Sequence, residues 1–241
     1  MRRFVFSALA GIYALGSLVI APPASAQAGT FEILLNGERI GTATCNFTAT
    51  AEGYNSTSIV RVSMQGLDYS LSKTEQLSSS NELQNVLLSG VVNGEAVNIT
   101  AAPDSGQLVL AISANGRKTT SRLAAHPGAV ILPDFDPGAL ETLLALAVKR
   151  NNRDLWAIFP KKSGSIEPVQ LATYADDQGT LDGNPITAHH LVATIAGAKI
   201  DLFSGPGNRL LQAELPQQGF ALVRNGFVLK PSARAAAPPA Q

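Results

Sequence analysis

The sequence predicts a mainly β fold, a curved antiparallel meander forming an open or closed barrel-like sheet, wrapped around one buried helix near residues 137–150. Three observations lead to this prediction. Short runs of alternating apolar and polar residues recur along most of the chain, as half-buried strands require. Asn-Gly pairs, which favour hairpin turns, separate several of these runs. Only one stretch has helical apolar spacing, so a fold built from parallel strand–helix–strand repeats is excluded.

The first half of the chain is predicted to consist of hairpins. Asn36-Gly37, Asn93-Gly94 and Asn115-Gly116 lie between β-prone runs and tolerate the positive φ angles of tight turns. In one of these runs Val60 and Val62 share a face, as in a half-buried strand. We expect strands over residues 30–35, 39–49, 58–64, 68–77, 82–92, 95–101, 107–114 and 117–123.

The single predicted helix has recognisable start and stop signals. Asp136 is suited to cap the N-terminus, Pro137 fits the first helical position, and Lys149 and Arg150 complement the negative end of the helix dipole. The leucines spread beyond a single stripe. We therefore expect the helix to be buried against the concave face of the sheet.

More strands are predicted after the helix. Residues 154–159 and 166–175 should pair, and three further strands with two short turns are expected within residues 180–224. Pro216 indicates a sheet edge or a bulge in the last of these strands. A surface ion pair between Arg224 and Glu214 is expected across this closing meander.

The two ends of the chain differ in composition from the rest. Arg2 and Arg3 precede an apolar run and an Ala-Ser-Ala site, which predicts a signal peptide over residues 1–26 and a periplasmic destination. Residues 231–241 are rich in Pro and Ala, and we expect a disordered tail. Residues 27–230 should then form a single β-rich domain, with no membrane span once the signal is cleaved. The lone Cys45 is expected to be buried.

Part of the closing meander resembles a known family. The runs Leu181-Asp-Gly-Asn-Pro-Ile, His189-His190-Leu, Asp201-Leu-Phe and residues 207–224 are similar to an uncharacterised family of exported bacterial β-rich proteins, classified as a domain of unknown function. The resemblance implies an exported β-rich domain without assigned catalytic residues. A curved sheet around one helix is also similar, in architecture alone, to lipoprotein carriers of the LolA and LolB type.

Charge and motifs argue against several classes of function. The chain has 18 basic and 18 acidic residues without long runs of either sign, which disfavours nucleic acid as a partner. His189 and His190 are adjacent in a predicted strand and point to opposite faces, so the two cannot share one metal ion. No catalytic motif occurs. We therefore predict no catalytic residues, metal or cofactor, and we expect a non-enzymatic protein.

Two functional hypotheses remain. In the first, the apolar inner wall of the sheet and the helix enclose a cavity for a lipid or another apolar molecule of the cell envelope. In the second, the protein is a structural or assembly factor of the envelope that acts through a protein partner, by pairing an exposed sheet edge. An ordinary filled core would explain the apolar stripes equally well. The residues predicted to line a cavity are Leu140, Leu144, Trp156, Leu191, Leu202 and Leu211.

Overall fold

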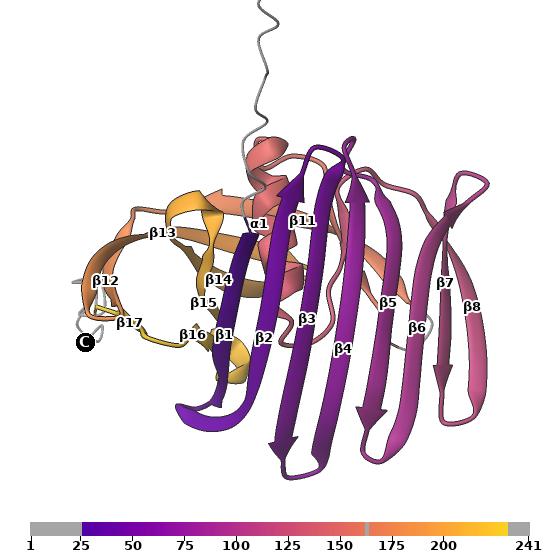
Figure 1. Ribbon diagram of the computed structural model, residues 1–241, viewed down its shortest axis with the longest axis horizontal. Coiled ribbons are helices and arrows are strands. Elements are labelled where there is room, and N and C mark those ends of the chain that lie inside the picture. The colour runs from indigo at the N-terminus through magenta and orange to yellow at the C-terminus, as the bar shows by residue number, and fades with distance from the viewer. Residues whose placement is uncertain (1–25, 162–163, 231–241) are drawn as a thin grey trace, which may run out of the picture.

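The computed structural model describes residues 26–161 and 164–230, so the predicted tail and all but the last residue of the predicted signal peptide lie outside the described residues. The described part is mainly β, with one sheet of 17 strands that does not close, and it contains a single α-helix (Figure 1). The predicted fold class is therefore confirmed. No helix in the described part is long and apolar enough to cross a membrane.

Strands β1 to β8 form an antiparallel meander in which each strand pairs with the next (Figure 1). At the first turn, Asn36 and Gly37 both have positive φ angles, of 51° and 85°, as a two-residue hairpin turn requires. The predicted hairpins are thus confirmed. The strands are β1 (Ala26–Leu35), β2 (Glu38–Thr50), β3 (Gly53–Met64), β4 (Leu67–Ser78), β5 (Leu83–Val92), β6 (Glu95–Asp104), β7 (Gln107–Ala114) and β8 (Arg117–Ala124).

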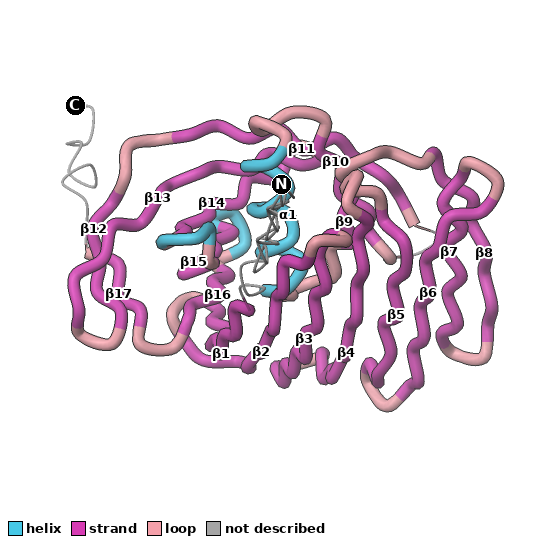
Figure 2. The backbone as a smooth tube through the Cα atoms, turned by 45° about the horizontal axis from the view of Figure 1, so that its top comes forward, coloured by secondary structure: helices cyan, strands magenta, loops and turns pink. Residues whose placement is uncertain are grey.

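Helix α1 spans Pro137–Lys149 and confirms the predicted helix. The Asp136 side chain caps its N-terminus by accepting a hydrogen bond from the backbone N–H of Ala139 at 3.2 Å. Most residues of α1 are buried, because the helix packs on the inner face of β2 and β3 and also contacts β15. The helix therefore fills the space that the sheet encloses (Figure 2).

One parallel pair interrupts the antiparallel pattern. Strand β9 (Ala129–Ile131) precedes α1, β10 (Leu155–Phe159) follows it, and the two strands pair in parallel. Strand β9 is not among the strands predicted from the sequence. Its three residues are all buried, so they show no alternation of apolar and polar side chains.

The second half of the sheet returns along the opposite side of α1 (Figure 2). Strand β16 pairs with β1 and so joins the two halves. The predicted count of three strands within residues 180–224 is wrong, because Pro216–Gln218 forms a short 3-10 helix and Gly219, with a φ of 71°, turns the chain back as β16. The strands are β11 (Ser165–Thr173), β12 (Asp177–Leu181), β13 (Asn184–Ile195), β14 (Ala198–Ser204), β15 (Leu210–Leu215), β16 (Phe220–Arg224) and β17 (Phe227–Leu229).

The described residues pack into two apolar clusters. The larger cluster joins α1 to the inner faces of most strands. The smaller one contains Ala188, Phe203, Leu211 and Phe227. Strand β12 pairs with both β13 and β17 at one end of the molecule (Figure 1).

Candidate ligand pocket at the start of helix α1

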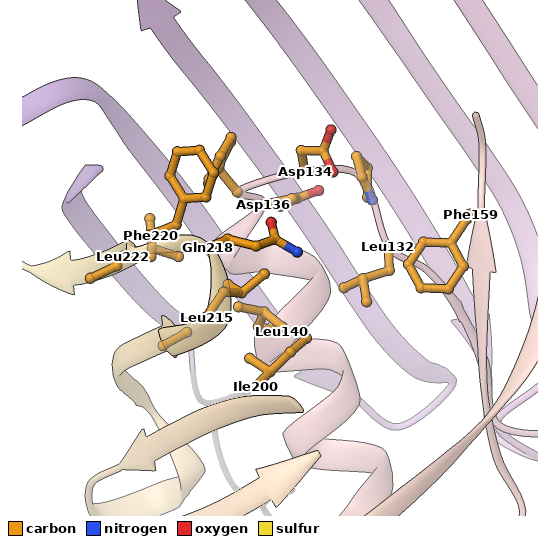
Figure 3. A pocket seen from close by; sticks show the side chains of 14 residues that line it. Leu132, Asp134, Asp136, Leu140, Phe159, Ile200, Leu215, Gln218, Phe220 and Leu222 are labelled. Carbon is orange, nitrogen blue, oxygen red and sulfur yellow. The ribbon is translucent and has the colours of Figure 1, made fainter. Parts of the chain in front are cut away.

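A pocket lies where α1 begins, and its volume is about 110 Å³ (Figure 3). Most of its lining is apolar, and its polar side chains are those of two aspartates and one glutamine. Ligand sites commonly combine an apolar wall with a few polar groups. The lining residues are Leu132, Pro133, Asp134, Phe135, Asp136, Leu140, Phe159, Ile200, Ala213, Leu215, Gln218, Phe220, Ala221 and Leu222.

The pocket brings together segments that are far apart in the sequence. Residues 132–136, which connect β9 to α1, supply one wall, and Leu140 from the first turns of α1 supplies another. Phe159 comes from the end of β10, and Gln218 comes from the 3-10 helix after β15. In Figure 3 the Gln218 amide lies between Phe220 on one side and Phe159 on the other.

Phe135 has an unusual backbone conformation in the pocket wall. Its φ is 56°, in the left-handed region that residues with large side chains rarely adopt, at a cost of about 1–3 kcal/mol. Its ring packs edge-on against Phe220, with the ring centroids 4.9 Å apart. The Tyr69 hydroxyl donates a hydrogen bond to the backbone oxygen of Asp134 at 2.9 Å. These contacts hold the wall in place, so the pocket is preformed.

A cluster of buried charges supports the pocket from the sheet side. The Lys73 ammonium lies 3.0 Å from Asp136 and 3.2 Å from Glu75, and all three side chains are almost fully buried. Glu75 also accepts hydrogen bonds from the Thr142 hydroxyl at 3.1 Å and the Ile131 backbone N–H at 3.3 Å. We call these four side chains, Lys73, Glu75, Asp136 and Thr142, the Lys73 cluster. It ties β4 to β9 and to the start of α1.

Burial and pairing act in opposite directions on the charges of the Lys73 cluster. Burial alone would lower the pKa of Lys73, but the charges of Asp136 and Glu75 outweigh it, and the pKa is raised. Burial raises the pKa of Glu75 although the Lys73 charge opposes this. Lys73 therefore keeps its proton and compensates the nearby carboxylates.

A second buried ion pair joins α1 to the C-terminal strands. An Nη of Arg224 lies 2.8 Å from Oε1 of Glu141, and the Arg224 side chain also donates to the backbone oxygens of Leu210 at 2.6 Å and Ala28 at 2.9 Å. Glu141 accepts a further bond from the Leu210 backbone N–H at 3.3 Å. Burial raises the pKa of Glu141 to about 7, although Arg224 opposes the shift.

The predicted surface pair between Arg224 and Glu214 is wrong. Glu214 lies opposite Ala221 in the ladder of β15 and β16. Residues 221 and 224 are separated by an odd number of positions, so Arg224 points to the other face of the sheet. Glu214 instead accepts a hydrogen bond from the side-chain amide of Gln212.

Cys45 is buried, as predicted. Burial raises the pKa of its thiol, and the Glu141 charge acts in the same direction. Because the thiolate is the reactive form of cysteine, the Cys45 thiol behaves as a small core residue.

The three histidines have separate neighbours. His126 stacks on Trp156, with the ring centroids 3.8 Å apart. His189 is 3.0 Å from Asp176, whereas His190 is 2.9 Å from Asp201 and stacks on Phe203. In residues 26–161 and 164–230, no three His, Cys, Asp or Glu side chains are arranged to hold a metal ion.

The structure places the six predicted lining residues in different surroundings. Of the six, Leu140 lines the pocket. Leu144 and Leu202 are buried in the larger apolar cluster, and Leu191 and Trp156 pack against it while partly buried. Five of these six residues therefore belong to or contact the same core, and Leu211 belongs to the smaller cluster.

Sequence reasoning missed the charges beneath the pocket, although a signal was present. In β4 the inner face reads Leu67, Tyr69, Leu71, Lys73, Glu75 and Leu77. Two charged residues thus occupy positions of an apolar stripe, and buried charges are rarely found without partners. Glu141 is likewise the one charged residue of α1 before Lys149. The apolar wall from residues 200–222 did have a local signal, because Ile200, Ala213 and Leu215 lie on apolar stripes of period two, but that pattern does not indicate which pocket they line.

The chain was compared with protein-family models, with curated proteins and with solved structures, and none of the three comparisons gave a match.

Proposed function

We propose that the protein binds a lipid or another apolar molecule of the cell envelope, and that one end of this ligand enters the pocket at the start of α1. The observation that supports this proposal is the preformed apolar pocket beside the strained Phe135. Strained residues concentrate at binding and catalytic sites because the surrounding structure must hold them. The Gln218 amide and the carboxyl groups of Asp134 and Asp136 are the polar side-chain groups in a mostly apolar wall, and Gln218 can offer the ligand a hydrogen bond.

The size of the pocket limits what can enter it. An apolar cavity of about 150 Å³ holds a benzene molecule. The pocket, at about 110 Å³, is smaller and accommodates a branched chain end or the end of an acyl chain. The remainder of a larger ligand would lie outside the mouth, next to the exposed ion pair of Lys161 and Asp134, whose charged atoms are 2.7 Å apart.

The proposed location is the periplasm, and the proposed role is non-enzymatic. Both rest on the N-terminal sequence with Arg2, Arg3 and an Ala-Ser-Ala site, and on the lack of a catalytic motif in the sequence. The resemblance of the closing meander to an exported bacterial family, and the architectural similarity to LolA-type carriers, support the same proposal.

A pocket-filling substitution tests the proposal. Leu140→Trp places an indole ring in the pocket, and it should abolish binding of an uncharged fluorophore that carries an octyl chain, measured by fluorescence titration. Val148→Trp is the matched control, because Val148 is on the same helix and is 58% exposed. Leu215→Trp, at a partly exposed position of the lining, provides a second filling variant if Leu140→Trp does not fold.

The proposal fails if the folded filling variants bind the fluorophore as well as the control does. It also fails if the wild-type protein does not bind the fluorophore. If the filling variants do lose binding, native mass spectrometry of protein purified from bacterial envelopes should identify the natural ligand as a mass that is present in the wild type and absent from Leu140→Trp.

One observation favours a second function, assembly through a protein partner. Strand β8 is eight residues long, and within the described residues its only ladder is with β7. An edge strand of this length can pair with a strand of another protein. Thr120→Pro would remove a backbone donor there, and loss of a cross-linked envelope partner in this variant, but not in Leu140→Trp, would support the second function.

A further inference from the structure

A second hollow, with an apolar floor, lies at the other end of the meander, on the inner face of β6, β7 and β8. Its volume is about 650 Å³, within the range of about 300–1,000 Å³ typical of small-molecule sites. It shares no lining residue with the pocket at the start of α1. We call it the β6–β8 groove, and it is lined by Val97, Ile99, Ile112, Ala114, Asn115, Arg117, Thr119 and Pro160.

The floor of the β6–β8 groove is a continuous apolar surface. Val97 pairs with Ala114 across β6 and β7, and Ile99 pairs with Ile112, so the four side chains lie on one face. Ile99 and Ile112 are nearly buried, whereas Val97 and Ala114 are partly exposed. This end of the meander extends beyond α1 (Figure 1), so the helix does not cover the floor as it covers β2 and β3.

A positively charged side chain, that of Arg117, lies at the end of this apolar floor. Arg117 pairs with Ala114 in the ladder of β7 and β8, and its side chain lines the groove. Arg117 is exposed and forms no ion pair with any described residue. The lining contains no acidic side chain. The groove thus combines an apolar floor with one uncompensated positive charge at its end.

We propose that the β6–β8 groove binds a long-chain carboxylate, with the alkyl chain on the apolar floor and the carboxylate on Arg117. A guanidinium matches a carboxylate through two parallel hydrogen bonds. The alkyl chain removes the exposed parts of Val97 and Ala114 from water. This site goes beyond the proposed function, because it is a separate site, selects a charged head group, and does not require the α1 pocket.

Calorimetric titration with dodecanoate and with dodecanol tests the role of charge. The two probes share a chain and differ in the head group. The wild type should bind dodecanoate more tightly, and Arg117→Gln should weaken dodecanoate binding about ten-fold and leave dodecanol binding unchanged. Lys118→Gln is the matched control, because Lys118 is adjacent, exposed, and on the opposite face of β8. Equal effects of Arg117→Gln and Lys118→Gln would overturn the proposal.

A second pair of variants tests the location. Ala114→Trp should fill the groove and abolish dodecanoate binding, while Ala111→Trp, on the opposite face of β7, should preserve it. Leu140→Trp should also preserve dodecanoate binding.

Two outcomes would overturn the groove proposal. If Leu140→Trp abolishes dodecanoate binding and Ala114→Trp does not, the groove proposal is wrong and the α1 pocket is the site. If the wild type binds the octyl-chain fluorophore but not dodecanoate, the groove proposal alone fails.

Discussion

The two ends of the N-terminal meander differ in what their inner face carries and in what covers it. At β2 to β4 the inner face includes polar side chains, among them Ser58, Lys73 and Glu75, and α1 packs directly on it. At β6 to β8 the inner face is apolar along Val97, Ile99 and Ile112, yet it opens into a groove. The covered end thus carries buried charges, whereas the charged side chain at the open end, Arg117, is exposed.

This difference has a physical reason. Charges on the inner face can be buried only where another element supplies partners; Thr142 of α1 and Asp136, which caps its N-terminus, are the partners here. An apolar face needs no specific partner, so it can remain partly open and be covered by a ligand. Buried charges therefore mark where the helix must dock, and the open apolar face is where we propose that a ligand binds.

The largest expected effect comes from removing the cation of the Lys73 cluster. Lys73→Met leaves Glu75 and Asp136 buried without a cation, which should lower the free energy of unfolding by about 3–5 kcal/mol in urea titrations. Arg122→Met, which breaks the exposed pair with Asp104 in the β6–β8 part, should leave the unfolding midpoint unchanged. Similar losses in both variants would contradict the distinction between the two ends.

A smaller effect is expected from pH, through Glu141. Its pKa is about 7 in the folded protein and 4.5 as the ordinary value, so between these values the folded state binds more protons than the unfolded state. The free energy of unfolding should therefore fall as the pH rises from about 4.5 through about 7, by roughly 3 kcal/mol. In Glu141→Gln, the unfolding temperature measured by thermal denaturation should change less with pH over this range.

Glu214→Gln provides the control for the pH experiment, because Glu214 contacts Gln212 and not Arg224. Its profile should follow that of the wild type. The expectation would be contradicted if the unfolding temperature of the wild type rose over this pH range and Glu141→Gln showed the same pH dependence. Glu141 would then ionise as an ordinary carboxyl group.

The smallest effect is expected at the pocket wall. Tyr69→Phe removes the hydrogen bond to the backbone oxygen of Asp134 and should cost about 1 kcal/mol of unfolding free energy. Because this bond helps to hold Phe135, amide exchange of residues 132–136 should also become faster, while exchange in β6 to β8 stays the same. Uniform changes over the whole sheet would mean that Tyr69 acts on global stability alone.

Local signals predicted the elements of this fold well. The Asn36-Gly37 turn and the Asp136 cap are decided by residues close in sequence, through the φ angles they tolerate and the hydrogen bonds they accept. The buried β9 and the turn at Gly219 were missed, because three uniformly buried residues and a proline near a strand end allow more than one conformation.

The candidate site was predicted only in part. Leu140 could be selected because helical spacing places it on the buried side of α1. Phe159, Gln218 and Phe220 join it only because β10 and the turn before β16 meet at the start of the helix. Such meetings depend on contacts between distant segments, which a periodic pattern does not encode.

The sequence by itself determined the hairpins, the single helix and its cap, because each depends on neighbouring residues and on the two-residue or 3.6-residue period of the side chains. The tertiary structure alone decided which charges became partners. Arg224 pairs with Glu141 rather than Glu214 because the sheet wraps around α1, and strand alternation then directs Arg224 toward the helix. Burial and long-range contact produced this choice, and both arise only when the whole chain has folded.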